Sequence, residues 1–278
     1  MSKTPERLPV RKTYKLYIGG AFPRSESGRS YPVTAPSGEV VHAAQASRKD
    51  VRDAVVAARA AFGKWSTATA YNRGQILYRV AEMMEGRREQ FVSYTSSAEV
   101  DAAIDRWVHY AGWADKYAQV VGGTNPVAGP YFNFTLPEPT GVVGVLAPQS
   151  SSLLGLVSVL APVLATGNTS VVVAAQDAPL PAISLAEVLA TSDLPGGVVN
   201  LLTGYTAELA PWLAAHRDVN ALDLTGAAPD LRAELQAAAA DNVKRVYVPR
   251  DEDWDASPGL SRLNAFVETK TVWHPIGV

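Results

Sequence analysis

PTGVVGVLAPQSSSLLGLVSVLAPVLATGNTSVVVAA, residues 139–175, is the stretch that decides the fold class. Two short apolar runs rich in valine, 141–148 and 169–175, flank a longer apolar run at 153–168. Short runs of β-branched residues are typical of strands buried on both faces, whereas the longer run has the length of a helix. A crossover of this length joins strands that run in the same direction. The stretch therefore predicts a strand, a helix and a second, parallel strand.

The same alternation of strand and helix continues toward the C-terminus. Further strands are predicted at 197–204, 219–226 and 243–248, and helical patterns lie between them through Leu185 and Leu189, near 207–216 and near 229–240. Repeated strand and helix units of this kind build a sheet with helices packed on both of its faces. The sequence therefore predicts an α/β fold with a doubly wound, mainly parallel, Rossmann-like sheet.

The region before this sheet predicts a hairpin and several helices. Residues 14–46 contain short apolar segments separated by glycine and proline, as in short strands joined by turns. Ser47 and Asp50 form a capping-box pattern, which predicts the start of a helix. Apolar residues then recur at helical spacing as far as Ala111, before a Gly/Pro-rich stretch at 122–130.

The composition excludes several classes of function. A formal net charge of −2 gives no basic field for nucleic acid, and the longest apolar stretch is interrupted by proline and glycine. We therefore expect a cytoplasmic protein that binds neither nucleic acid nor a membrane and has no signal peptide. The 278 residues include no cysteine, which removes thiolate chemistry. The four histidines, at 42, 109, 216 and 274, have no zinc-site spacing, so we expect no metal.

Several of these segments resemble the aldehyde dehydrogenase superfamily. PTGVVGVLAP at 139–148 is similar to the family's first nucleotide-domain strand, and LPGGVVNLLTG at 194–204 to its third strand with the preceding turn. AAHRDVNALDLTG at 214–226 and NVKRVYV at 242–248 resemble two further segments of the same domain. The resemblance covers roughly residues 14–248 in order. It is specific because several motifs occur at the family's spacing.

The resemblance also indicates a missing domain. Family members acylate a cysteine in a catalytic domain that lies between this sheet and a C-terminal strand, and that strand adds to a neighbouring subunit's sheet. This chain instead resembles a truncated and degenerate member. It divides into an N-terminal hairpin and helical segment (1–139), a Rossmann-like domain (140–250), an acidic linker that replaces the catalytic domain (251–263) and a C-terminal oligomerisation strand (264–278).

Catalytic positions of the family are replaced in this sequence. Ser150 stands where the family has the asparagine that stabilises the oxyanion, a task that needs a hydrogen-bond donor aimed at developing negative charge. Pro249 stands at the position of the general-base glutamate, and a proline side chain cannot transfer a proton. The resemblance therefore implies that the chain is not an enzyme.

The cofactor-binding positions have changed as well. Val173 and Gln176 replace the lysine and the glutamate that hold the cofactor ribose in the family, and Ala227 replaces a serine that contacts the pyrophosphate. Two of the three glycines in the turn that begins at Gly204 are lost. We expect no cofactor, and NAD or NADP only if this vestigial site survives. Its positions are Pro148, Val173, Gln176, Gly204, Gly226 and Ala227.

These replacements favour a non-catalytic structural or regulatory subunit. Its expected partners are a full-length aldehyde dehydrogenase, a second copy of itself, or both, through Phe266, Val267, Thr269, Thr271, Val272 and Trp273. One alternative is a sensor that retains weak affinity for a nucleotide or another ligand. Another is serine-based hydrolysis at 150–152, although serines before an apolar helical run are usually helix caps. The acidic residues at 251–255 lack the full pattern of a calcium-binding loop.

Overall fold

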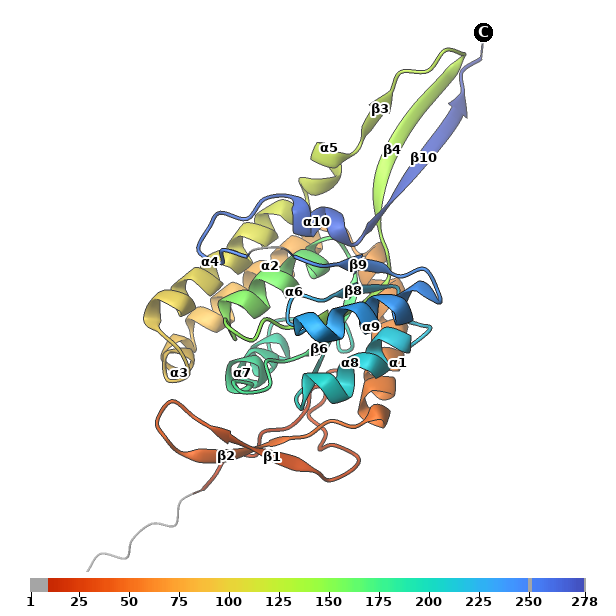
Figure 1. The fold of residues 1–278 in the computed structure, drawn as a ribbon. Coiled ribbons are helices and arrows are strands. Elements are labelled where there is room, and N and C mark those ends of the chain that lie inside the picture. The colour runs from red at the N-terminus through yellow and green to blue at the C-terminus, as the bar shows by residue number, and fades with distance from the viewer. Residues whose placement is uncertain (1–9, 250–251, 278) are drawn as a thin grey trace, which may run out of the picture.

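A five-stranded parallel sheet forms the centre of the protein, as seen in a computed structural model that describes residues 10–249 and 252–277 (Figure 1). The strand order is β7-β6-β5-β8-β9, and every neighbouring pair is parallel. The strands are β5 (Val142–Leu146), β6 (Thr169–Val173), β7 (Val199–Leu202), β8 (Ala221–Asp223) and β9 (Arg245–Tyr247). The predicted α/β fold with a parallel sheet is confirmed.

Both faces of this sheet are buried, because successive side chains of each strand join opposite apolar clusters. On β5, Val143 and Val145 belong to one cluster, whereas Val142 and Leu146 belong to the other. The first cluster includes α2 (Ala70–Glu85), α4 (Ser97–Ala114), α6 (Leu154–Ala165) and α7 (Leu180–Leu189), and the second includes α1 (Arg48–Thr67), α8 (Thr206–Ala215) and α9 (Pro229–Ala240). Helices on both faces make the sheet doubly wound. Among the helices of residues 10–249 and 252–277, none combines the length and the hydrophobicity that a membrane span needs.

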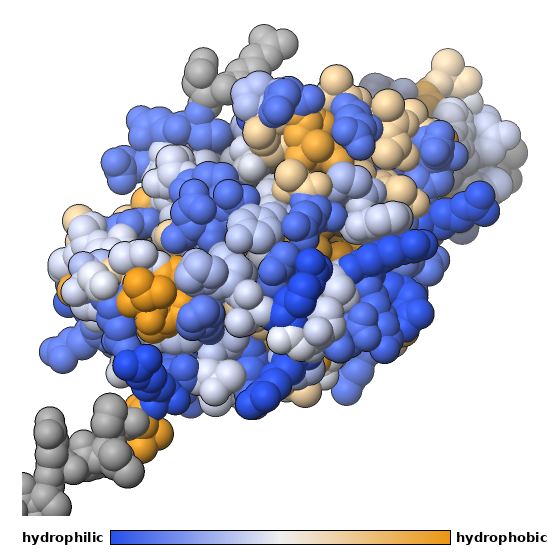
Figure 2. Space-filling view, turned by 60° about the horizontal axis from the view of Figure 1, so that its bottom comes forward, coloured by the Kyte–Doolittle hydropathy of each residue, from blue (hydrophilic) through white to orange (hydrophobic). Residues whose placement is uncertain are grey.

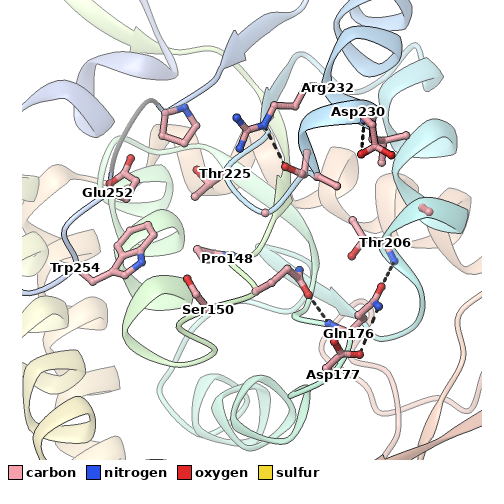
Figure 3. A pocket seen from close by; sticks show the side chains of 17 residues that line it. Pro148, Ser150, Gln176, Asp177, Thr206, Thr225, Asp230, Arg232, Glu252 and Trp254 are labelled. Carbon is pink, nitrogen blue, oxygen red and sulfur yellow. Dashed lines mark hydrogen bonds between the residues drawn. The ribbon is translucent and has the colours of Figure 1, made fainter.

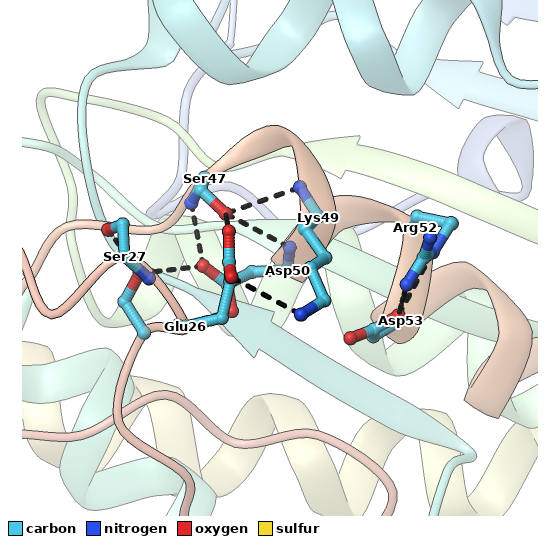
Figure 4. A network of polar contacts seen from close by, with 8 residues as sticks. Glu26, Ser27, Ser47, Lys49, Asp50, Arg52 and Asp53 are labelled. Carbon is cyan, nitrogen blue, oxygen red and sulfur yellow. Dashed lines mark hydrogen bonds and ion pairs between the residues drawn. The ribbon is translucent and has the colours of Figure 1, made fainter.

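The N-terminal region begins with a hairpin of β1 (Ser30–Thr34) and β2 (Val40–Ala44). Helix α1 follows, and Figure 4 shows the capping box at its start. The Ser47 hydroxyl accepts hydrogen bonds from the amides of Lys49 and Asp50, and the Asp50 carboxylate accepts one from the Ser47 amide at 2.7 Å. The capping box predicted from the sequence is confirmed. A short helix, α3 (Arg88–Val92), connects α2 and α4.

A second, antiparallel sheet projects from the body, and we call it the arm (Figure 1). It consists of β3 (Gly123–Asn125), β4 (Tyr131–Pro139) and β10 (Val267–Pro275) in the order β10-β4-β3, with α5 (Tyr117–Val121) before it in the chain. Strand β10 pairs with β4 from Val267 opposite Pro139 to Pro275 opposite Tyr131. The C-terminal strand thus pairs within its own chain, and the expected division places β4 and β10, the two long strands of one sheet, in different segments.

The segment expected to be a solvated acidic linker, 251–263, differs from that description. Asp251 lies outside the described residues, and Glu252 is half-buried. Arg262 and Leu263 belong to a short helix, α10 (Ser261–Ala265), and both are buried. Arg262 pairs with Asp223, which is fully buried in the central sheet. A buried carboxylate requires a cation beside it, and the segment 252–263 packs against the body because it supplies that cation, Arg262.

Candidate functional site

A cavity of about 730 Å³ lies at the carboxyl ends of the parallel strands (Figure 3). The strand order reverses there, between β5 and β8, and doubly wound sheets bind ligands at that point. The turns after all five strands contribute to its walls: Pro148 after β5, Gln176 after β6, Thr206 after β7, Thr225 after β8 and Pro249 after β9. This cavity is the candidate site.

Two glutamine side chains connect the strand ends on one side of the cavity (Figure 3). The Gln149 amide donates to the carbonyl of Ala147 at 2.9 Å and accepts from the Gln176 backbone amide at 3.0 Å. The Gln176 side-chain oxygen accepts from the amide of Thr206, the first residue of α8, at 3.4 Å. Gln176 is thus a neutral cap for a helix, and its side-chain oxygen is already engaged.

The start of α9 faces the same cavity, and its first turn carries a proline and an acidic residue. Pro229 has no backbone N–H to donate, and the Asp230 carboxylate accepts from the Leu231 amide at 3.1 Å. The Arg232 guanidinium turns back to the carbonyl of Ala227 at 3.1 Å. A helix N-terminus binds phosphate through free amides and a positive dipole end. Here the missing Pro229 N–H removes one donor, and the Asp230 carboxylate places a negative charge at the helix start.

The start of α6 is likewise occupied by a carboxylate of the chain. Glu99 of α4 accepts hydrogen bonds from the amides of Leu153 and Leu154 at 3.3 and 3.2 Å. Ser151 donates to the same carboxylate at 3.0 Å and accepts from the Gly155 amide at 2.8 Å. Ser151 therefore has a capping role. No histidine is among the described residues that line the cavity, so Ser150 has no imidazole base beside it.

The charges around the cavity are unfavourable to a second anion. Its described lining includes the carboxylates of Asp177, Asp230 and Glu252, against the single guanidinium of Arg232. Glu252 is paired with Arg262, which does not line this cavity. Like charges that share a partly desolvated site repel one another, and a dinucleotide would add two phosphates to them. The described residues also contain no group of three potential metal ligands.

A buried ion pair lies at the end of β8, behind the cavity. Asp223 contacts Arg262 at 2.8 Å, and the Arg262 guanidinium also contacts Glu252 at 2.6 Å. Burial raises the pKa of the Asp223 carboxyl, and the neighbouring Arg262 charge and the hydrogen bonds from Thr225 oppose that rise. The cation is therefore required to keep the buried carboxylate charged.

Most of the eight catalytic and cofactor-binding positions taken from the sequence lie around this one cavity. Six of them line it: Pro148, Ser150, Gln176, Gly226, Ala227 and Pro249. Val173 lies within β6 and is fully buried, and Gly204 is buried in the turn before α8, so neither belongs to the lining. Phe266 and Val267, expected at an interface, are buried in the chain's own core. Phe266 and Val267 therefore cannot contact a partner chain and are not part of the proposed interface.

Sequence reasoning missed Arg232, Glu252 and Trp254 in the cavity wall. Arg232 belongs to the helix expected near 229–240 and forms part of no motif. Glu252 and Trp254 belonged to a segment interpreted as a linker. A tryptophan inside an acidic stretch was the available signal, because so large an apolar side chain is seldom left in solvent.

Gly226 joins the β8 turn to the end of β5, and we predict a large effect of adding one methyl group there. Its amide donates to the carbonyl of Leu146 at 2.8 Å, and a Cβ atom would lie 1.9 Å from the carbonyl oxygen of Ala147. Gly226→Ala should lower the free energy of unfolding by about 1–3 kcal/mol, the usual range for overpacking. Urea unfolding measures this. Gly259→Ala, where nothing lies within 4 Å of the added atom, is the matched control and should change little.

Fold and cavity together define the class: a doubly wound α/β domain of the nucleotide-binding type, with its crevice at the switch point of the sheet. The sequence model of the aldehyde dehydrogenase family matches residues 22–249. The chain belongs to the aldehyde dehydrogenase family.

Individual relatives support the same assignment. An aldehyde dehydrogenase family 2 member of Arabidopsis thaliana is 36% identical over 247 residues, covering 84% of this chain and 45% of the relative. Omega-crystallin of Enteroctopus dofleini is 32% identical over 260 residues, covering 87% of this chain and 51% of the relative. The NAD⁺ complex of a Bacillus cereus aldehyde dehydrogenase has a TM-score of 0.75 and 28% identity, covering 84% of this chain and 50% of that one. The chain spans about half the length of these relatives.

Proposed function

We propose that the chain is a non-catalytic member of the family that acts as a structural or regulatory subunit. It assembles through the arm with a full-length aldehyde dehydrogenase, with a second copy of itself, or with both. The observation that carries this proposal is the arm. It is fully formed and projects from the body. The crevice, in contrast, is lined by Ser150 and Pro249 at the two positions where the resemblance implies catalytic groups.

The outer edge of β10 supports assembly by strand addition. In the described residues β10 pairs with β4 along one edge, and no strand pairs with its other edge. Thr269, Thr271 and Trp273 are exposed, Val272 is half-exposed, and no proline interrupts 267–274. An exposed edge of this length offers a row of backbone donors and acceptors to another chain. These four residues form the proposed interface.

Apolar side chains on the arm support the same use. Phe132 and Leu136 of β4 are 47% and 43% exposed, and Trp273 of β10 is 58% exposed. Trp273 packs edge-to-face against Tyr131, with ring centres 5.6 Å apart. The face on the side of β1 and β2, toward the viewer in Figure 2, is mainly polar or neutral, and its apolar residues lie in separate small patches. Exposed apolar residues grouped on one projection are typical of an association surface.

The absence of chemistry is proposed from the cavity. Ser150 and Pro249 stand at positions where the family places an oxyanion donor and a general base, and Gln176 is engaged as a helix cap. Asp230 adds a negative charge in the first turn of α9. Losing several hydrogen bonds worth about 1–3 kcal/mol each would weaken cofactor binding by orders of magnitude.

Calorimetry with NAD and NADP tests this proposal against the alternative of a ligand sensor. We expect no heat of binding at cofactor concentrations up to about 1 mM. The loss of several contacts should raise the dissociation constant of the cofactor complex to this concentration or above it. A full-length aldehyde dehydrogenase titrated in the same buffer is the positive control. A saturable heat at a stoichiometry near one would contradict the proposal and support a nucleotide sensor instead. Serine-based hydrolysis has no support from the geometry around Ser150.

A further inference from the structure

Residues 252–262 cross the body as a segment that we call the strap. It runs from the cavity wall at Glu252 and Trp254 to α10, and apart from α10 it contains no helix or strand. Most of its side chains between 253 and 259 are exposed, although Trp254 is half-buried against the first apolar cluster. With so little regular structure, the strap depends on a few side-chain contacts for its position.

Arg106 of α4 provides the first of these contacts. Its guanidinium donates to the backbone carbonyls of Trp254 at 2.6 Å and Ala256 at 3.2 Å, and to the Ser158 hydroxyl at 2.7 Å. Arg106 is 9% exposed, and no carboxylate of the described residues lies within ion-pair distance of it. A buried cation that bonds only neutral oxygens depends on every one of them. The strap supplies two of the three.

Arg262, at the other end of the strap, provides the second contact. Its guanidinium bridges the buried Asp223 at 2.8 Å and the strap's own Glu252 at 2.6 Å. It also lies over the rings of Tyr247 and Trp254, at 4.8 and 5.4 Å from their centres. The two ends of the strap are therefore joined to each other through one side chain that is anchored in the central sheet.

The strap separates two spaces. Trp254 and Glu252 line the main cavity, and they also line a smaller cavity of about 270 Å³ beneath the strap. The smaller cavity reaches Arg106, Ser158 and Arg262. Figure 3 draws Glu252 and Trp254 together at one side of the main cavity, with Thr206 at the opposite side. Displacing the strap would merge the two spaces and remove one wall of the main cavity.

We propose that the strap is a movable cover of the cavity at the sheet ends, and that Arg106 is the latch that holds it closed. The covered state has its full set of hydrogen bonds to Arg106, and the open state exchanges them for water. Opening leaves the two apolar clusters of the body in place, because the strap contributes only Trp254 and Leu260 to the first cluster. The buried Leu263 lies just beyond the strap in α10. Access to the cavity past the strap does not depend on assembly through the arm.

Thiol labelling tests the latch directly, because the chain has no cysteine of its own. Ser158→Cys places a thiol beneath the strap, at a position that is 1% exposed. It replaces the Ser158 hydroxyl that accepts from Arg106 but leaves the two strap carbonyls, of Trp254 and Ala256, as partners of Arg106, so the comparison is made within this background. Ser192→Cys is the matched control, since Ser192 is fully buried beyond the end of α7 and away from the strap. The labelling rate of each thiol with Ellman's reagent is measured with and without Arg106→Met.

Arg106→Met should raise the labelling rate of Cys at position 158 by about tenfold to a hundredfold, the range expected for losing hydrogen bonds to a charged donor. The rate at position 192 should stay the same. Equal rates at 158 with and without the substitution would overturn the proposal, and so would a parallel rise at both positions. If Arg106→Met does not fold, Glu252→Gln takes its place, because it weakens the ion pair between the strap and Arg262. This variant should raise the labelling rate at position 158 alone, and no rise there overturns the proposal.

Discussion

Removing residues 269–278 should convert the assembled protein to monomers without unfolding it. The deletion removes residues 269–275 of β10, which are exposed apart from the half-buried Val272, whereas Phe266 and Val267 remain in the core and Glu268 keeps its pair with Arg245 at 2.6 Å. Strand β4 would then become the edge, but Pro137 and Pro139 cannot donate to a new neighbour. The loss of several backbone hydrogen bonds should raise the dissociation constant at least about a hundredfold.

Light scattering at a fixed protein concentration measures this change, with circular dichroism to show that the body remains folded. Lys270→Gln is the control, because it removes the ion pair with Glu138 at 2.9 Å and keeps the backbone of β10. The control should retain the assembled mass. If the truncated chain keeps its mass as well, β10 is not the assembly element.

Arg262→Met should cause the largest loss of stability among the single substitutions considered. It leaves Asp223 fully buried without a cation and also releases Glu252. Breaking a buried pair by removing one partner costs about 3–5 kcal/mol. Arg79→Met is the matched control, since the exposed Arg79–Glu82 pair at 3.1 Å should be worth about 1 kcal/mol or less.

The loss caused by Arg262→Met should also depend on pH in a defined direction. Burial raises the pKa of the Asp223 carboxyl, and removing Arg262 takes away the main influence that opposes this rise. A folded-state pKa above the unfolded value means that stability is greatest below the unfolded pKa and falls as pH rises through the folded pKa. Urea unfolding of the variant from pH 4 to pH 8 should show a growing deficit against the parent chain. A deficit that shrinks over this range would contradict the assignment.

The central sheet could be predicted from the sequence because its signals are local. The valine-rich runs of β5 and β6 are buried on both faces, and strands of that kind are recognised by their composition alone. The boundaries of α9, Pro229–Ala240, match the expected helix, since a proline favours the first helical turn. Six of the candidate site residues gather at one cavity because each follows a strand of the same parallel sheet.

The parts that could not be predicted depend on contacts between distant residues. Arg106 meets the strap across 148 positions, and no periodicity or motif within the strap indicates this partner. Strand β10 pairs with β4 across a similar separation, so Phe266 and Val267 looked like part of an open strand when they are core residues. No sequence motif singles out Asp230, and only the fold places it at the cavity.

Native mass spectrometry of the purified chain, alone and mixed with a full-length aldehyde dehydrogenase from the same organism, tests the central claim most directly. The chain has a mass of 29.6 kDa, so each copy in a complex is readily counted. We expect multiples of this mass, complexes that combine it with the full-length subunit in a fixed ratio, or both, and we expect all of them to disappear when residues 269–278 are removed. A chain that stays monomeric, beside an enzyme whose mass does not change, would contradict the proposed role as an assembly subunit.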